Sequence, residues 1–192
     1  MRTWLAACLV LLPAAPAAAQ WAVAPEFGVV GFGVAARDSD GTNVGAERAN
    51  VIGLRVTVGN FHRAVGLRVR HGSGGLRLSG HGLSVVQEGV FDFTELSAFC
   101  AVRVFRIGES SMQVEAGPTL TIWNPTGESS RSRVGGAVDL AWVLPAGRSL
   151  AAAVRVETSV SGSVFDQADL PSSATRRATW RQGMFFEVRR TF

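Results

Sequence analysis

The residues that could do chemistry are few, and their spacing favours neither a metal site nor a cofactor site. The sequence holds three histidines, His62, His71 and His81. We expect His62 in a tight turn, whereas His71 and His81 lie at the opposite end of the predicted fold. No nearby cysteine or carboxylate pattern completes a ligand set for either group. The sequence therefore predicts no metal site and no cofactor.

One segment carries the side-chain types of a hydrolase: His81, Ser84 and Glu88. A nucleophilic serine needs a base and an orienting group held at hydrogen-bond distance. Ser84 lacks a nucleophile elbow, and all three residues fall in a polar loop. A glycine-rich piece, Gly72–Gly75, has no following Lys or helix, so it is no phosphate loop and predicts a flexible hairpin. The sequence predicts a protein that is not an enzyme.

Charged residues alternate with aliphatic ones along much of the chain. In the segment Val51–Gly59, for example, Ile52 and Leu54 share one face and Arg55 the other. This period of two is typical of a β-strand. Acids and bases are balanced on the polar faces, which carry Arg55, Arg68, Glu95, Arg103, Glu115, Asp139, Arg155, Glu157, Glu187 and Arg189.

Eight segments show this alternation, and together they predict an all-β fold. Most have close to the about 9–11 residues that a tilted strand needs to cross a bilayer. The segments are Glu26–Arg37, Val51–Gly59, Ala64–His71, Phe93–Phe105, Met112–Trp123, Arg133–Leu144, Ser149–Ser159 and Arg177–Phe192.

The connections between these segments alternate in length. Three are tight turns, at 60–63, 106–110 and 145–148, and four are long, at 38–50, 72–92, 124–132 and 162–176. All tight turns and both termini then lie at one end, and tight hairpins favour an antiparallel up-and-down order. The second long connection has apolar residues of its own. It could extend its two strands as a hairpin or fold across the barrel mouth.

Periodicity alone does not say which face lies inside a barrel. A soluble barrel such as a lipocalin puts its apolar face inward, and a membrane barrel puts it outward. Here glycine and alanine separate the charges, which suits the lumen of an eight-stranded barrel because side chains only just fill it. Buried charges must be paired, and arginine presents a planar fork to a carboxylate. We therefore predict a plugged lumen holding an ion-pair network.

Aromatic residues near the strand ends are consistent with a membrane protein. Trp123 and Trp180 fall at the long-loop end, and Trp142 and Phe192 fall near the tight-turn end. Aromatic side chains at both membrane interfaces form the girdles of transmembrane barrels. These four residues are the predicted interface aromatics.

The first 19 residues predict a secretory signal peptide, which leaves residues 20–192 as one barrel domain. Arg2 precedes a short apolar run, and Ala17–Ala19 supplies small residues for cleavage. Cys100 is then the only cysteine of the mature chain, so no intramolecular disulfide can form. All 19 basic residues are arginine. That composition does not indicate a nucleic-acid partner.

The last strand, Arg177–Phe192, reads RATWRQGMFFEVRRTF and alternates up to a terminal aromatic residue. It resembles the closing strand of small eight-stranded bacterial outer-membrane β-barrel proteins, in which a terminal Phe serves as the signal for the insertion machinery. Arg190 departs from that pattern, because the family usually has an apolar residue there.

The resemblance covers the whole mature chain by architecture. It implies an eight-stranded antiparallel up-and-down transmembrane β-barrel in the cell outer membrane. The implied protein is a monomer with a structural or surface-interaction role, and its partners are outer-membrane lipid, lipopolysaccharide and the barrel-insertion machinery. Two alternatives stay open: a soluble secreted lipocalin-like carrier of an apolar ligand, and a lipid A-modifying outer-membrane enzyme.

Overall fold

A computed structural model describes residues 20–60, 62–80, 83–127, 129–166 and 172–192. The predicted signal peptide, residues 1–19, lies outside this range. Nowhere in the described range is there a helix with the length and apolarity to cross a membrane. The strands are β1 (Gln20–Phe32), β2 (Val34–Arg37), β3 (Asn43–Ala46), β4 (Ala49–Gly59), β5 (Arg63–Gly80), β6 (Leu83–Ile107), β7 (Ser110–Pro125), β8 (Arg131–Pro145), β9 (Leu150–Ser161), β10 (Thr175–Arg176) and β11 (Thr179–Thr191).

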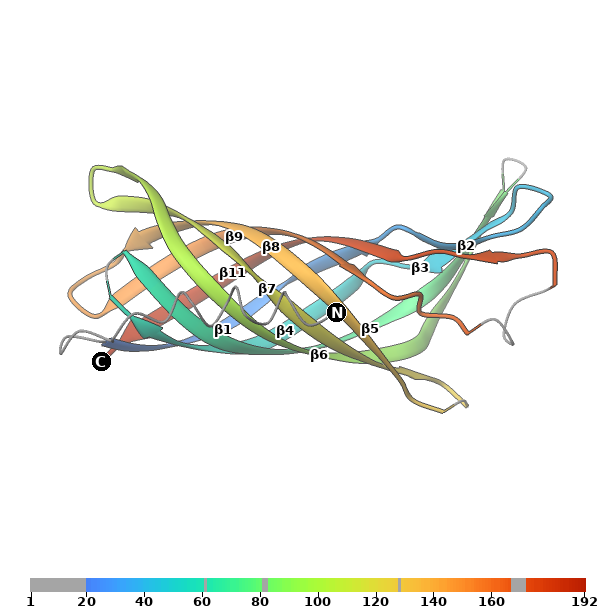
Figure 1. The fold of residues 1–192 in the computed structure, drawn as a ribbon, viewed down its shortest axis with the longest axis horizontal. Coiled ribbons are helices and arrows are strands. Elements are labelled where there is room, and N and C mark those ends of the chain that lie inside the picture. The colour runs from blue at the N-terminus through green and yellow to red at the C-terminus, as the bar shows by residue number, and fades with distance from the viewer. Residues whose placement is uncertain (1–19, 61, 81–82, 128, 167–171) are drawn as a thin grey trace, which may run out of the picture.

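Eight of these strands close a ring by hydrogen bonding. Their order around the ring is β1, β4, β5, β6, β7, β8, β9 and β11, and β11 pairs with β1 again. Every neighbouring pair is antiparallel. The ring forms a long cylinder whose tight turns and C-terminus share one end (Figure 1). The predicted all-β, eight-stranded, up-and-down barrel is confirmed.

Three short strands extend the barrel wall at the long-loop end. β2 continues β1 beyond Gly33, β3 pairs with β5, and β10 pairs with β2. Figure 1 shows this extension around the labels β2 and β3. The predicted connections at 38–50 and 162–176 therefore contain paired backbone, which satisfies polar groups that a free loop would leave to water.

The strands β5 and β6 continue into a long hairpin, one of the two alternatives left open by the sequence, but the prediction of a flexible hairpin at Gly72–Gly75 is wrong. These glycines lie inside β5, beside a bulge between Gly74 and Leu76. A Cβ added to Gly72 would lie 2.9 Å from the ring of Phe93, and one on Gly74 would lie 2.8 Å from the ring of Phe91. Glycine at these two positions leaves room in the lumen for the rings of Phe93 and Phe91. The second long connection thus extends its strands.

The first strand starts at Gln20, six residues before the predicted start at Glu26. Pro25 reads as a strand breaker in sequence because it has no N–H to donate. In the barrel, β1 keeps its full register with β4 through Pro25, while Ala24 and Pro25 have no register partner in β11. Pairing with β4 therefore keeps Pro25 within the strand.

The strand faces are sorted by polarity as the alternation predicts. Leu54 and Leu67 point outward and are 45% and 68% exposed, whereas Arg55 and Arg155 are 1% and 0% exposed. Because β-strand side chains alternate, the same sorting recurs on each strand of the ring. On the ring strands the outward side chains are mainly apolar, and the charged side chains on the inward faces are enclosed.

Candidate functional site in the barrel lumen

The centre of the lumen holds two arginines that share two carboxylates. Arg55 Nη2 lies 2.6 Å from Glu115 Oε1, and Arg155 Nη1 lies 2.6 Å from Glu115 Oε2. The other carboxylate is Glu187, whose Oε2 lies 2.8 Å from Arg155 Nη2 and 3.4 Å from Arg55 Nη1. The four residues come from β4, β7, β9 and β11, so the ion pairs cross the lumen and link opposite walls.

A second group lies next to this one along the barrel axis. Arg68 donates to Asp139 Oδ2 at 2.7 Å and to Glu157 Oε2 at 2.8 Å. Arg70 also donates to Glu157. Arg155 Nη1 lies 3.5 Å from Asp139, which connects the two groups into one network.

Three members of the network were missed by the sequence prediction: Glu26, Arg70 and Arg181. Arg70 Nε donates to Glu26 Oε1 at 2.5 Å, and Arg181 pairs with Glu95. Arg70 and Arg181 lie two and eight positions from the predicted Arg68 and Arg189, on the same strand faces. Continuing the period-two count would have found them. Glu26 was not identified because its strand was expected to begin there.

Phenylalanine rings fill the space between the buried guanidinium groups. Arg55 lies with its guanidinium carbon 4.3 Å from the centroid of Phe99, and Arg70 lies 3.5 Å from that of Phe185. A cation over a ring face is attracted by the ring quadrupole. The rings therefore fill the lumen and also make favourable contacts with the faces of the guanidinium groups.

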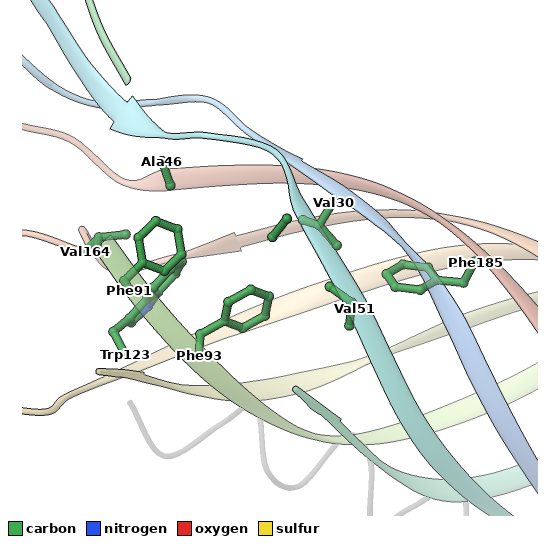
Figure 2. Packing of buried hydrophobic residues seen from close by; sticks show 9 residues of the cluster. Val30, Ala46, Val51, Phe91, Phe93, Trp123, Val164 and Phe185 are labelled. Carbon is green, nitrogen blue, oxygen red and sulfur yellow. The ribbon is translucent and has the colours of Figure 1, made fainter. Parts of the chain in front are cut away.

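The long-loop end of the lumen is filled by aromatic residues. Phe32, Phe91, Phe93 and Trp123 have neighbouring ring centroids 5.2–6.5 Å apart. Figure 2 shows Phe91, Phe93 and Trp123 lying together, with Val164 beside them. We call these four aromatic residues the aromatic plug.

Trp123 is therefore not an interface aromatic, and that prediction is wrong. Its side chain is 0% exposed and lies inside the barrel. Trp123 shares its strand face with Thr119 and Thr121, which are also buried. A position near the strand end suggested the interface, but the period-two alternation decides the direction of the side chain.

The other predicted interface aromatics lie on the outer surface. Trp142, Trp180 and Phe192 are 49%, 57% and 67% exposed. Trp21, which the sequence analysis did not select, is exposed to the same degree at the tight-turn end. The amphipathic indole rings of the tryptophans suit a lipid–water boundary at such positions.

The tight-turn end of the lumen keeps a cavity of about 170 Å³. Arg189 lies in its wall and donates to Glu187 Oε1 at 2.6 Å. Arg103, the remaining predicted member of the network, is half-buried in the same wall. The lumen thus passes from a cationic cavity through the ion pairs to the aromatic plug.

Comparisons with known proteins identify the fold. No protein-family model and no curated protein matches the sequence. Among solved structures, Neisserial surface protein A (NspA) matches with a TM-score of 0.61 and 10% identity, over 91% of this chain and 99% of that one. OprG from Pseudomonas aeruginosa, an outer membrane protein, matches with a TM-score of 0.57 and 12% identity, over 90% and 95%.

A third structure is similar over the same length. It is Ail, the attachment invasion locus protein of Yersinia pestis, solved with the heparin analogue sucrose octasulfate. It matches with a TM-score of 0.50 and 14% identity, over 91% of this chain and 99% of that one. At such low identities the likeness concerns the fold, and it agrees with the strand ring described above. The chain therefore has the fold of the small eight-stranded β-barrel proteins of bacterial outer membranes.

Proposed function

We propose that this protein is an integral outer-membrane β-barrel with a closed lumen and a structural or surface-interaction role. One observation carries the proposal: aliphatic side chains cover the outside of the barrel, and arginine–carboxylate pairs occupy its inside. Ile52, Leu67 and Val134 are 67–74% exposed, which is unfavourable in water. In a bilayer the same exposure is favourable, because lipid tails solvate apolar side chains and exclude charge.

The closed lumen is supported by two different kinds of filling. The ion-pair network joins strands across the barrel centre, and the aromatic plug fills the long-loop end. An ion entering this path would have to displace paired charges and then cross an apolar constriction. We infer that the barrel conducts no ions under ordinary conditions.

The surface that we propose for interaction is the long-loop end, which would face the cell exterior. There Arg133 Nη2 lies 2.7 Å from Asp166 Oδ1, Arg131 Nε lies 3.6 Å from Asp166 Oδ2, and Arg176 Nη1 lies 3.7 Å from Oδ1. Three guanidinium groups thus share one carboxylate. These arginines suit the phosphates of lipopolysaccharide, since arginine binds phosphate with a fork of donors. Ail's structure with a heparin analogue makes sulfated sugars a second ligand class to test.

The carrier alternative is opposed by the same sorting of side chains. A lipocalin-like carrier needs an apolar interior for its ligand, and here the interior centre holds Arg55, Arg155 and Glu115. For the lipid A-modifying enzyme, Ser84 is exposed near the tip of the β5–β6 hairpin. His81 and the side chain of Glu88 lie outside the described residues. An activity of the wild type on lipid A that the Ser84→Ala variant lacks would support that alternative.

Fractionation tests the membrane assignment. We expect the exported protein to stay in the membrane fraction without detergent, and to show a heat-modifiable shift on a gel after extraction. Recovery of the folded protein in the soluble periplasmic fraction would overturn the assignment. Planar bilayer recordings test the lumen separately, since steady large pores would contradict the closed state while leaving the membrane assignment intact.

A further inference from the structure

The outer wall of the barrel carries a groove across the neighbouring strands β9, β11, β1, β4 and β5, with a volume of about 1150 Å³. We call it the wall groove. Its lining includes two rows of side chains that are register partners from strand to strand. The first row is Val154, Phe186, Phe27, Ile52 and His71, and the second is Val156, Met184, Val29, Asn50 and Ser73. These side chains point outward, because they alternate with the buried side chains of the same strands.

Both rows change from apolar to polar in the same direction. Every member on β9, β11 and β1 is apolar, whereas β5 contributes His71 and Ser73, and β4 adds Asn50 to the second row. Arg48, which precedes β4, also lines the wall groove and is exposed. Side chains of these four types can all donate hydrogen bonds. The wall groove thus has an apolar end and a donor-rich end.

The donor-rich end lies nearer to the long loops than the apolar end does. Val154 comes four positions after Leu150, the first residue of β9, whereas Ser73 comes ten positions after Arg63, the first residue of β5. Both strands begin at tight turns, and a tilted strand needs about 9–11 residues to cross a bilayer. In the proposed membrane orientation, the apolar end is therefore at the depth of lipid tails and the donor-rich end at the outer headgroups.

Glycine keeps the wall groove open between its two ends. Apart from its chain neighbours, a Cβ added to Gly31 would have one described heavy atom within 4 Å, the Gln182 carbonyl oxygen at 3.8 Å. Closer to the apolar end, the rings of Phe27 and Phe186 have centroids 5.2 Å apart and form an apolar side of the groove. A lipid chain can therefore lie against the backbone at Gly31 and continue along these rings.

Two carboxylates lie near the donor-rich end. Glu47 already pairs with Arg77, whose Nε lies 2.6 Å from Glu47 Oε2. Asp92 is exposed and is the register partner of Ser73 on β6, outside the lining. The described residues that line the wall groove include no Asp or Glu. The lining thus favours an anionic headgroup, and Asp92 opposes that headgroup from the edge.

We propose that the wall groove binds one phosphate-bearing lipid of the outer leaflet, the lipid A part of lipopolysaccharide. An acyl chain lies along the apolar rows, and a phosphate accepts charge-assisted hydrogen bonds at the end marked by Arg48. His71 Nδ1 lies 3.2 Å from Thr94 Oγ1, which leaves the other ring nitrogen for the headgroup. This inference rests on the membrane placement proposed above. Its residues are different from the arginines around Asp166.

The test is a lipid titration of the exported, folded barrel in detergent, followed by native mass spectrometry. One arm uses lipid A, and the other uses the same lipid A stripped of its phosphates. We expect one lipid A per barrel, bound about tenfold or more tightly than the dephosphorylated form, because charge-assisted hydrogen bonds are lost with the phosphates.

Equal binding of the two forms would overturn the proposal, and so would the absence of a one-to-one complex. A third arm uses phosphatidylethanolamine, and tighter binding of that lipid than of lipid A would also overturn it. None of these results would affect the membrane assignment, which fractionation tests separately. Recovery of the folded protein in the soluble fraction would instead remove both proposals.

Three variants locate the lipid. Gly31→Leu fills the opening without changing any charge, and it should abolish the one-to-one complex. Arg48→Gln should weaken binding of lipid A about tenfold and leave binding of the dephosphorylated form unchanged. Asp92→Asn removes the opposing charge, so it should strengthen binding of lipid A.

Arg177→Gln is the matched control for the loss of a positive charge. Arg177 is exposed at the same end of the barrel and lies outside the lining, so this variant should bind lipid A like the wild type. The heat-modifiable gel shift shows that each variant is folded, so a folding failure is not read as a binding loss. Equal affinities for Arg48→Gln and Arg177→Gln, or unchanged binding in Gly31→Leu, would contradict the wall groove as the site.

Discussion

Glu115 shows how single residues hold the lumen together. Its two oxygens each lie 2.6 Å from a different guanidinium group, Arg55 on one side and Arg155 on the other. All three side chains are at most 1% exposed. Buried ion pairs need not stabilise a protein relative to a packed apolar core, but removing one partner leaves an uncompensated charge.

We therefore predict that Glu115→Gln destabilises the barrel by about 3–5 kcal/mol, the usual cost of breaking a buried pair. The measurement is the free energy of unfolding by urea in lipid vesicles. Glu109→Gln, in the exposed β6–β7 turn, removes an equal charge and should change the stability by less than about 0.5 kcal/mol. Similar values for the two variants would mean that Glu115 carries no buried charge pair.

A second residue-scale prediction concerns the tryptophans. Trp123 is enclosed in the lumen, whereas Trp142 and Trp180 are about half exposed on the outer wall. Variants in which one of these three is the single tryptophan of the barrel, with Trp21 also replaced, can be reconstituted in vesicles that contain brominated lipid. We expect strong fluorescence quenching for Trp142 and Trp180 and little for Trp123. Quenching of Trp123 equal to that of the other two would place its ring outside the barrel.

At the scale of one element, neighbouring glycines of β8 have different reasons to be glycine. A Cβ on Gly135 would lie 2.2 Å from the carbonyl oxygen of Val160 and 2.9 Å from the Ser161 Cβ. A Cβ on Gly136 would meet only one atom, the Gly117 carbonyl oxygen at 3.8 Å. Backbone on the paired strand cannot move aside as a flexible side chain would.

Gly135→Ala should therefore destabilise the barrel by about 1–3 kcal/mol, as expected for overpacking. Gly136→Ala should be neutral or slightly stabilising, because alanine restricts the unfolded chain more than glycine does. Urea unfolding of the two variants side by side measures the difference. The prediction fails if Gly136→Ala is the more damaging change.

The closing strand β11 makes a prediction about assembly. Its register runs along β9 and β1, and Phe192 donates its backbone N–H to Trp21 O at 2.8 Å. Phe192 remains 67% exposed, with the Arg190 guanidinium carbon 5.1 Å from its ring centroid. We therefore propose that its role is recognition by the insertion machinery, as the resemblance to the closing strands of outer-membrane barrels implies.

Phe192→Ala should lower the amount of folded barrel in the outer membrane while leaving unfolding of the purified barrel almost unchanged. Arg190→Leu restores the apolar pattern and should not lower the amount assembled. Folded protein in membranes is quantified by the heat-modifiable gel shift. Equal assembly of the wild type and Phe192→Ala would exclude a signal at the terminal residue.

At the scale of the whole molecule, we propose that the lumen has two independent obstacles to ions in series. The ion-pair network spans the centre, and the aromatic plug closes the end toward the long loops. Removing one obstacle leaves the other in place. Conductance should therefore depend on both together.

We predict that Phe93→Ala combined with Trp123→Ala produces no steady pore in planar bilayers, although loss of these rings destabilises the fold by several kcal/mol. The ion pairs at the barrel centre still block the path. Adding Glu115→Gln and Arg68→Gln to that variant should give measurable conductance if the barrel still assembles. Large pores from the aromatic changes alone would show that the ion pairs do not close the lumen.

The sequence by itself determined the strand faces and the alternation of short and long connections. Arg55, Glu115 and Leu54 could be assigned to faces because side chains alternate with a period of two. The balance of arginine and carboxylate then indicated that the polar face lies inside. The same alternation places Trp123 in the lumen, whereas its position at the strand end suggested the interface.

Only the tertiary structure decided which charges meet. Arg55 and Glu187 are 132 residues apart in the chain, and their contact depends on the register and stagger of the strands between them. The same holds for the glycines at 72 and 74, which predict a flexible hairpin until the Phe93 and Phe91 rings are placed beside them. Periodicity is a local property of the chain, whereas cross-lumen partners follow from how the ring closes.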